Sequence, residues 1–143
     1  MVYRVGIIGT GAFAHTHAQA LMTLRDRVEI VAAANIDSAQ GEAFCRQYDI
    51  PALYPSAEAL LESAHPDIVH LCTPPITHAP LAKLALKAGA HVLSEKPLCG
   101  SLAEFESLEQ VQAESGRSLS TVFQWRFGAA AQHVKRLIAA GEF

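Results

Sequence analysis

Cysteine is scarce in this sequence, and the few that are present are widely spaced. Among the 143 residues only Cys45, Cys72 and Cys99 are cysteines, and no two of them form a C-x-x-C pair. An odd number of isolated thiols argues against a disulfide framework and against a structural zinc site. We therefore expect a protein of a reducing compartment, the cytoplasm.

Charge is also scarce, and the long uncharged run is broken by polar residues. Only 17% of the residues are charged, and 14 acidic against 11 basic side chains give a net charge of −3. The basic residues are scattered, so they form no cationic stripe for a nucleic-acid backbone. The run at 5–24 contains three glycines, two histidines and three threonines, which disfavour a membrane span or a signal peptide. We expect neither nucleic acid nor a membrane as a partner.

What the sequence does have is a regular alternation of apolar and amphipathic segments. Half of the residues are hydrophobic, enough for the core of one domain. Segments typical of buried strands occur at residues 3–9, 28–35, 68–72, 91–94 and 120–123, with a weaker candidate near Leu53 and Tyr54. Amphipathic segments lie between them. This order predicts an α/β fold, a doubly wound and mostly parallel sheet of the Rossmann type with helices on both faces.

Several helix ends can be read from capping residues. Asp37 with a glutamine three residues later, and Ser101 with a glutamate three residues later, have the spacing of a capping box. Thr77 is expected to cap a helix that runs to residue 88, and Gly89 to end it in the left-handed conformation. The periodic run 130–140 predicts a last helix, with Gly141 behind it.

A glycine-rich turn follows the first predicted strand. Gly9, Gly11 and Ala14 have the G-x-G-x-x-A spacing of a dinucleotide-binding loop, between a strand and a helix. Gly9 permits a tight turn, and Gly11 leaves space for a pyrophosphate at the amides of the helix N-terminus. Glycines also end strands for structural reasons alone, but the flanking elements favour binding. Ala12 and Phe13, inside the motif, are therefore further candidates for cofactor contact.

The end of the second predicted strand should contact the adenosine ribose. Asn35 stands where an acidic residue is typical of NAD-binding proteins, and Asp37 follows two residues later. Asn35 lacks the charge that repels the 2'-phosphate of NADP, yet Ile36 is not the arginine that would bind it. Asp37 could bind the ribose, or it could only cap the next helix. The sequence favours NAD and leaves NADP open.

Charged residues and prolines follow the later strands, where a buried sheet would prefer uncharged residues. In a doubly wound sheet, ligands bind outside the carboxyl ends of the strands, where the strand order reverses. We therefore expect the edge that carries the glycine loop to carry three further groups beside a nicotinamide ring: Thr73, Pro74 and Pro75; Glu95, Lys96 and Pro97; and Gln124, Trp125 and Arg126.

With these motifs the chain resembles the N-terminal domain of the glucose-fructose oxidoreductase, inositol dehydrogenase and rhizopine catabolism (Gfo/Idh/MocA) family. The resemblance covers the whole chain, through "GIIGTGAFAHTHAQAL", "HPDIVHLCTPPITHAPLAKLALKAGAHVLSEKPL" and "FQWRFGAAAQHVKRLIAAGEF". The middle block is the most specific, because it combines a proline-bearing loop, a histidine four residues past it and an E-K-P sequence. The family contains nicotinamide-dependent oxidoreductases that act mostly on sugars, cyclitols and related polyols, so the resemblance implies such a small-molecule substrate.

The resemblance implies a catalytic role for Lys96, the lysine of E-K-P. Half-buried beside the cofactor, it would hydrogen-bond the substrate hydroxyl and ease its proton transfer while hydride moves. Glu95 would contact the cofactor side of the site. Pro97 would fix the turn, and some turns of this kind contain a cis peptide bond before the proline. The alternative is an exposed Glu95–Lys96 ion pair that contributes little.

Other positions keep a structural interpretation beside the functional one. Residues 73–75 would wall the nicotinamide and its ribose, or only end a strand. His78 matches a family histidine that lies near the cofactor, but a structural hydrogen bond suits it at least as well as catalysis. Residues 124–126 match a segment that approaches the cofactor, or belong to an ordinary crossover. His15 and His17 point to different sides of a helix, and we expect no metal site.

The resemblance also implies a second domain. Residues 1–125 are expected to form the dinucleotide-binding domain, and residues 126–143 a crossover helix that leads to an antiparallel substrate domain absent from this chain. The chain would then be a weakly active or inactive fragment of a longer dehydrogenase, which is expected to be a homo-oligomer. The alternative is a stand-alone dinucleotide-binding sensor or interaction module without catalysis.

Overall fold

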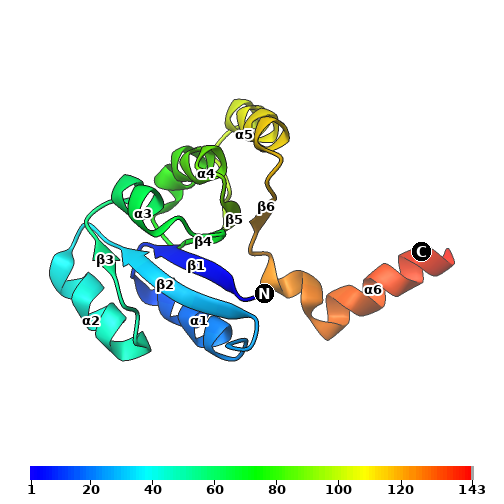
Figure 1. Cartoon of the computed structure of the whole chain (residues 1–143). Coiled ribbons are helices and arrows are strands. Elements are labelled where there is room, and N and C mark those ends of the chain that lie inside the picture. Colours follow the sequence, from blue (N-terminus) through cyan, green and yellow to red (C-terminus); the bar gives the residue numbers. More distant parts are fainter. Residues whose placement is uncertain (143) are drawn as a thin grey trace.

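Six strands form one parallel sheet in the order β3-β2-β1-β4-β5-β6 (Figure 1). The computed structural model describes residues 1–142. Its strands are β1 (Tyr3–Ile8), β2 (Val28–Ala34), β3 (Leu53–Tyr54), β4 (Ile68–Leu71), β5 (His91–Ser94) and β6 (Leu119–Thr121). The strand order reverses between β1 and β4, which confirms the doubly wound arrangement predicted from the sequence.

Helices cover both faces of this sheet (Figure 1). Helices α1 (Ala12–Met22) and α2 (Ser38–Tyr48) lie on one face, and α3 (Ala57–Ala64), α4 (His78–Lys87) and α5 (Leu102–Ser115) lie on the other. Strand β1 supplies both cores, because its side chains alternate: Val5 and Ile7 pack with the α1 and α2 side, whereas Ile8 packs with α3 and α4. Burial on both faces explains why this strand is continuously apolar.

The predicted helix caps are partly confirmed. Asp37 Oδ1 accepts a hydrogen bond from the Gln40 amide (3.0 Å), and Ser101 Oγ accepts one from the Glu104 amide (3.2 Å). Thr77 does precede α4, but the prediction that its hydroxyl caps the helix is wrong. The hydroxyl lies 2.7 Å from the Pro74 carbonyl oxygen, because the 3-10 turn η1 (Pro75–Thr77) leads directly into α4.

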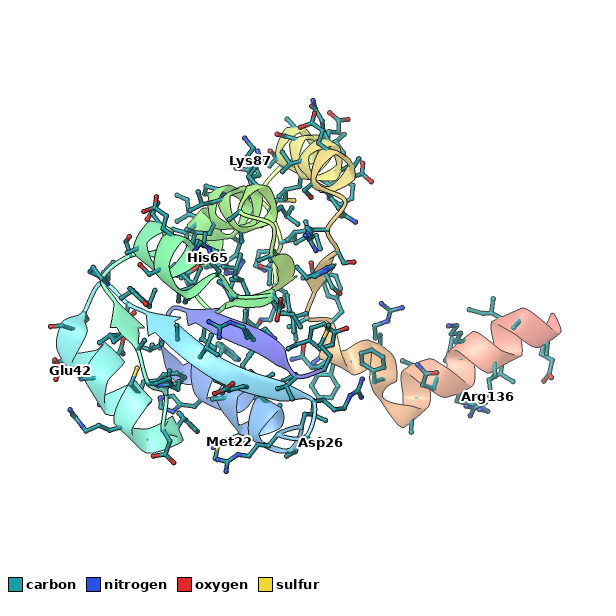
Figure 2. All side chains as sticks on the ribbon, viewed as in Figure 1. Met22, Asp26, Glu42, His65, Lys87 and Arg136 are labelled. Carbon is teal, nitrogen blue, oxygen red and sulfur yellow. The ribbon has the colours of Figure 1, made fainter. Side chains whose placement is uncertain are left out.

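Helix α6 (Ala129–Ala140) stands apart from the sheet and its covering helices (Figure 1). It follows a second 3-10 turn, η2 (Gln124–Phe127), and none of its residues is buried. Arg136 marks this helix in Figure 2, at the end of the molecule away from the sheet. Within residues 1–142, no helix combines the length and the apolar character that a membrane crossing requires.

Candidate cofactor and active site

The register of the sheet brings the carboxyl ends of its strands to one edge. Ile8 at the end of β1 pairs with Ala34 of β2 on one side and with Leu71 of β4 on the other. Leu71 pairs in turn with Ser94 of β5, and Ser94 with Thr121 of β6. The segments that follow these residues therefore leave the sheet side by side, at the edge where the sequence predicted a ligand.

The glycine loop after β1 has the geometry that the motif predicts. Gly9 has φ of 87°, and a Cβ there would lie 2.8 Å from the Cys72 carbonyl oxygen, so only glycine fits. Gly11 has an ordinary φ of −74°, and a Cβ there would meet nothing within 4 Å. The tight turn therefore needs Gly9, whereas the space above Gly11 lies open to a ligand.

The first turn of α1 offers hydrogen-bond donors to this space. No side chain caps the helix at Gly11, and within the described residues the amides of Ala12 and Phe13 donate to no protein acceptor. Thr10 Oγ1 is the one buried side-chain polar atom there without a partner. Free amides at a helix N-terminus favour an anion. The loop therefore fits the pyrophosphate of a dinucleotide.

The loop after β2 is organised by its own side chains. Asn35 Nδ2 donates to the Asp37 carbonyl oxygen (2.9 Å) and to Gln40 Oε1 (3.0 Å), so both amide protons are already used. Asp37 acts as the helix cap, which leaves its second carboxylate oxygen for a ribose hydroxyl. Contact of Asn35 or Asp37 with the ribose stays a prediction, because no ligand tests it.

Glu95 is not a surface charge; it belongs to a buried polar cluster. Its Oε1 lies 3.1 Å from His17 Nε2, and its Oε2 accepts a hydrogen bond of 3.1 Å from the Lys96 amide. His17 Nδ1 lies 2.9 Å from His70 Nδ1. The cluster thus joins α1, β4 and the turn after β5. The alternative of an exposed Glu95–Lys96 ion pair is wrong, because the buried carboxylate pairs with His17.

Burial and charge shift two pKa values around this cluster. Burial, with a smaller electrostatic contribution from the neighbouring His17, lowers the pKa of His70 to about 3. His70 is therefore neutral at physiological pH. Burial, with a smaller contribution from the negative charge of Glu95, raises the pKa of Cys72 to about 12, so this thiol stays protonated.

Lys96 lies beside the glycine loop, although the two are far apart in the sequence. Its Nζ is 5.7 Å from the centroid of the Phe13 ring, within the reach of a cation–π contact. The side chain itself is exposed. The expected half-burial refers to Lys96 beside a bound cofactor and stays a prediction. The Lys96–Pro97 peptide bond is cis.

The corner after β4 is tied to the turn after β5. Thr73 Oγ1 lies 2.7 Å from Thr77 Oγ1, and Pro75 begins the 3-10 turn that leads to His78. The His78 ring is buried and contacts the carbonyl oxygens of Thr73 and Pro97. These hydrogen bonds support a structural role for His78. Whether residues 73–75 line the nicotinamide stays a prediction.

The third predicted group, residues 124–126, forms none of the described hydrogen bonds with the other two groups. Gln124, Trp125 and Arg126 form the exposed turn η2, and its hydrogen bonds run to Phe123, Gly128 and Gln132. Trp125 is 83% exposed. The predicted boundary after residue 125 falls inside this turn. Cofactor contacts from these residues stay a prediction.

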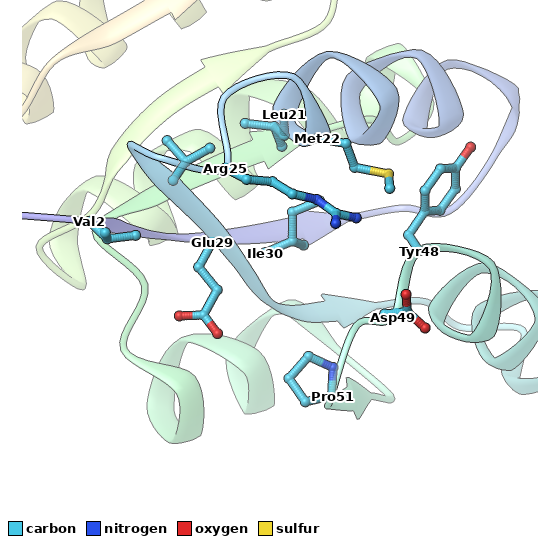
Figure 3. A pocket seen from close by; sticks show the side chains of 10 residues that line it. Val2, Leu21, Met22, Arg25, Glu29, Ile30, Tyr48, Asp49 and Pro51 are labelled. Carbon is cyan, nitrogen blue, oxygen red and sulfur yellow. The ribbon is translucent and has the colours of Figure 1, made fainter.

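A cavity of about 500 Å³ lies away from the glycine loop and from the turns after β4 and β5 (Figure 3). Its lining includes Leu21 and Met22 at the end of α1, Arg25 in the turn that follows, Ile30 in β2, and Tyr48 at the end of α2. It lies at the opposite edge of the sheet from the glycine loop. In the part of the chain that the structure describes, no group of three or more His, Cys, Asp or Glu side chains is arranged to hold a metal ion.

Fold, glycine loop and free helix amides together define a dinucleotide-binding domain. The chain belongs to the Gfo/Idh/MocA oxidoreductase family with the NAD-binding Rossmann fold, whose model matches residues 3–123. The predicted family is therefore confirmed, and NAD is the cofactor of this domain.

Relatives with known activities resemble the chain over nearly its whole length. It is 28% identical over 138 residues to D-glucoside 3-dehydrogenase of Escherichia coli, and 30% identical over 139 residues to D-apiose dehydrogenase of Paraburkholderia graminis. It matches the WlbA dehydrogenase of Bordetella pertussis, solved with NADH and UDP-GlcNAcA, with a TM-score of 0.95 and 28% identity over the whole chain. The chain spans 39%, 37% and 43% of these proteins, respectively.

His17 and His70 are site residues that sequence reasoning missed. His17 was weighed only as a metal ligand, with no acidic residue near it in the sequence. The fold supplies that acid, Glu95, from the turn after β5. A signal was available, because His70 is a polar residue in the middle of an apolar strand.

Proposed function

We propose that the chain is the cofactor-binding part of a dehydrogenase that acts on a sugar, cyclitol or related polyol, with Lys96 as its catalytic residue. The observation that carries the proposal is the position of Lys96 Nζ, 5.7 Å from the ring of Phe13 in the glycine loop. This position, beyond the last residue of β5 and beside the glycine loop, supports a role for Lys96 at the edge of the sheet where we propose that the cofactor binds.

The free amides of Ala12 and Phe13 would hold the pyrophosphate of NAD, and the bound cofactor would supply the hydride acceptor for the oxidation of a carbinol carbon. The hydroxyl oxygen on that carbon must lose its proton in the same reaction. In our proposal Lys96 hydrogen-bonds this oxygen. As the neutral amine it receives the proton, and as the ammonium ion it returns the proton in the reverse reaction. Glu95 does not compete for this role, since both of its oxygens already accept hydrogen bonds from His17 and the Lys96 amide.

The substrate class is supported by the named activities of the relatives, two of which are sugar or glycoside dehydrogenases. The chain spans about two fifths of their length, so we infer that the parent protein carries a further domain after residues 126–143. Exposed apolar side chains on α6, Val134 and Ile138, support a contact surface there. A cytoplasmic homo-oligomer is part of the same proposal and rests on the family resemblance.

The cofactor site can be tested by Gly11→Asp. A Cβ at residue 11 would meet no atom within 4 Å, so the free energy of unfolding should change by less than about 1 kcal/mol. The added carboxylate should, however, occupy the pyrophosphate space and repel it. Calorimetric titration should show NAD affinity weakened at least about 10-fold. Ala20→Glu, on the exposed half of the same helix, adds the same charge and should leave affinity unchanged.

Equal NAD affinity in the Gly11→Asp variant and the unmodified chain would contradict the site. The same titration with NADP should show weaker binding than NAD, because the Asp37 carboxylate would repel a 2'-phosphate. For catalysis, Lys96→Ala in the full-length parent should abolish most turnover and leave NAD affinity nearly unchanged. Retained turnover would contradict the role of Lys96.

A further inference from the structure

His78 connects the two loops that leave β4 and β5. It is the first residue of α4 and only 1% exposed. Its Nε2 lies 2.7 Å from the Thr73 carbonyl oxygen, and its Nδ1 lies 2.6 Å from the Pro97 carbonyl oxygen. Neither Thr73 nor Pro97 lies in a strand or a helix, so the regular hydrogen bonds of the fold do not use these two carbonyls.

Both contacts need a proton from the ring. A carbonyl oxygen only accepts, so the ring nitrogen must be the donor in each contact. A neutral imidazole has one N–H group and one nitrogen with a bare lone pair. In either neutral tautomer that lone pair would face a carbonyl oxygen at 2.6 or 2.7 Å, which is repulsive. Only the imidazolium ion donates from both nitrogens.

The distances and the orientation of the ring agree with this assignment. The two N···O distances, 2.6 and 2.7 Å, are at or below the short end of the range for N–H···O hydrogen bonds, as is typical when the donor is charged. A ring turned by 180° about its Cβ–Cγ axis would place C–H groups at both oxygens and leave the two carbonyls without an N–H donor. Two good acceptors also offset part of the cost of burying a cation.

We propose that His78 is an imidazolium in the folded protein and a positioning residue for Lys96, because its two hydrogen bonds fix the Glu95–Pro97 turn against the corner after β4. The turn is then held on both sides of the lysine. Before it, the Glu95 amide donates to the Leu71 carbonyl oxygen (2.9 Å); after it, the Pro97 carbonyl oxygen accepts from His78. This inference rests on the proposed function, which makes Lys96 the catalytic residue.

Nitrogen NMR on the chain itself tests the protonation of the ring without any cofactor. The ring nitrogens of the histidines are observed in a 15N-labelled sample at a pH of about 7.5, where an ordinary histidine is mostly neutral. His78 is assigned by the signals that disappear in the His78→Gln variant. We expect protons on both Nδ1 and Nε2 of His78. One protonated and one bare nitrogen would overturn the proposal.

A binding experiment tests the positioning role. ADP-ribose contains the part of NAD that the glycine loop binds and lacks the nicotinamide. The His78→Gln variant releases not only the turn with Lys96 but also the corner at Thr73, which is expected to wall the nicotinamide. Through the loss of this wall we expect NAD affinity to fall at least about 10-fold and ADP-ribose affinity to change less than about 2-fold. His133→Gln, on the exposed helix α6, should change neither.

An equal loss for both ligands, or no loss for either, would overturn the positioning role. If His78→Gln does not fold, the NMR measurement on the unmodified chain, with His78 assigned through its neighbours, still decides the protonation. Failure of the unmodified chain to bind NAD would contradict the proposed function and would leave the NMR result standing. The two failures can therefore be told apart.

Discussion

Removal of the His17 ring should destabilise the fold far more than removal of an exposed charge. His17→Leu takes the partner from Glu95 Oε1 and from His70 Nδ1, which lie 3.1 and 2.9 Å from the ring nitrogens. Glu95 then keeps a buried carboxylate with the Lys96 amide as its hydrogen-bond donor. Loss of one partner of a buried pair costs about 3 kcal/mol, and an unpaired ring nitrogen adds about 1 kcal/mol.

We therefore expect His17→Leu to lower the free energy of unfolding by about 4 kcal/mol. This is less than the total stability of most domains of this size, so the variant should still fold in water. The double variant His17→Leu/Glu95→Leu should lose about 2 kcal/mol less than the sum of the single variants, because no buried charge is left without a partner.

Urea denaturation followed by circular dichroism measures these differences. The matched control is Arg46→Gln, which breaks the exposed pair of Arg46 with Glu42 on α2 (3.5 Å). It should cost less than about 0.5 kcal/mol. A loss below about 1 kcal/mol in His17→Leu, or strict additivity in the double variant, would refute the assignment of this cluster as a coupled buried network.

Three further predictions concern single groups around the site. The pKa of His70 lies at about 3 in the folded chain against an ordinary 6.5, so the unfolded chain binds an extra proton between these values and stability falls as the pH drops below 6.5. His70→Gln should reduce this fall by up to about 1.4 kcal/mol per pH unit in urea titrations; equal slopes would contradict it. Gly9→Ala adds a Cβ at a residue with φ of 87° and against the Cys72 carbonyl, and should lower the free energy of unfolding by at least about 2 kcal/mol. Gly11→Ala should lower it by less than about 1 kcal/mol. Thermal melts that rank the two variants in the other order would contradict the loop geometry. The thiol of Cys72, with its pKa raised to about 12, should be alkylated by iodoacetamide at pH 8 far more slowly in the folded chain than in urea, and mass spectrometry showing equal rates would count against its buried setting.

Features that depend on local sequence could be predicted well. The turn at Gly9, the cap at Asp37 and the cap at Ser101 each need only a few neighbouring residues, and all three are observed. Helix α3 is not among the predicted helix starts, although Ser56 caps it through the Ala59 amide. Its segment is short, and no glutamate or glutamine stands at the capping-box position to mark it.

Features that depend on the meeting of distant segments could not be predicted. The contact of His17 with Glu95 requires α1 to meet the turn after β5, which no spacing in the sequence reveals. The same holds for the two carbonyls at His78. The burial of Lys96, a residue at the edge of the sheet, depends in addition on what covers that edge.

Chemical-shift mapping of the 15N-labelled chain with NADH measures most directly where the cofactor binds. We expect the largest changes at the amides of Gly11, Phe13, Thr73 and Lys96, which lie at the carboxyl edge of the sheet. Changes confined to the cavity at the opposite edge, around Arg25 and Tyr48 (Figure 3), would contradict the proposed site.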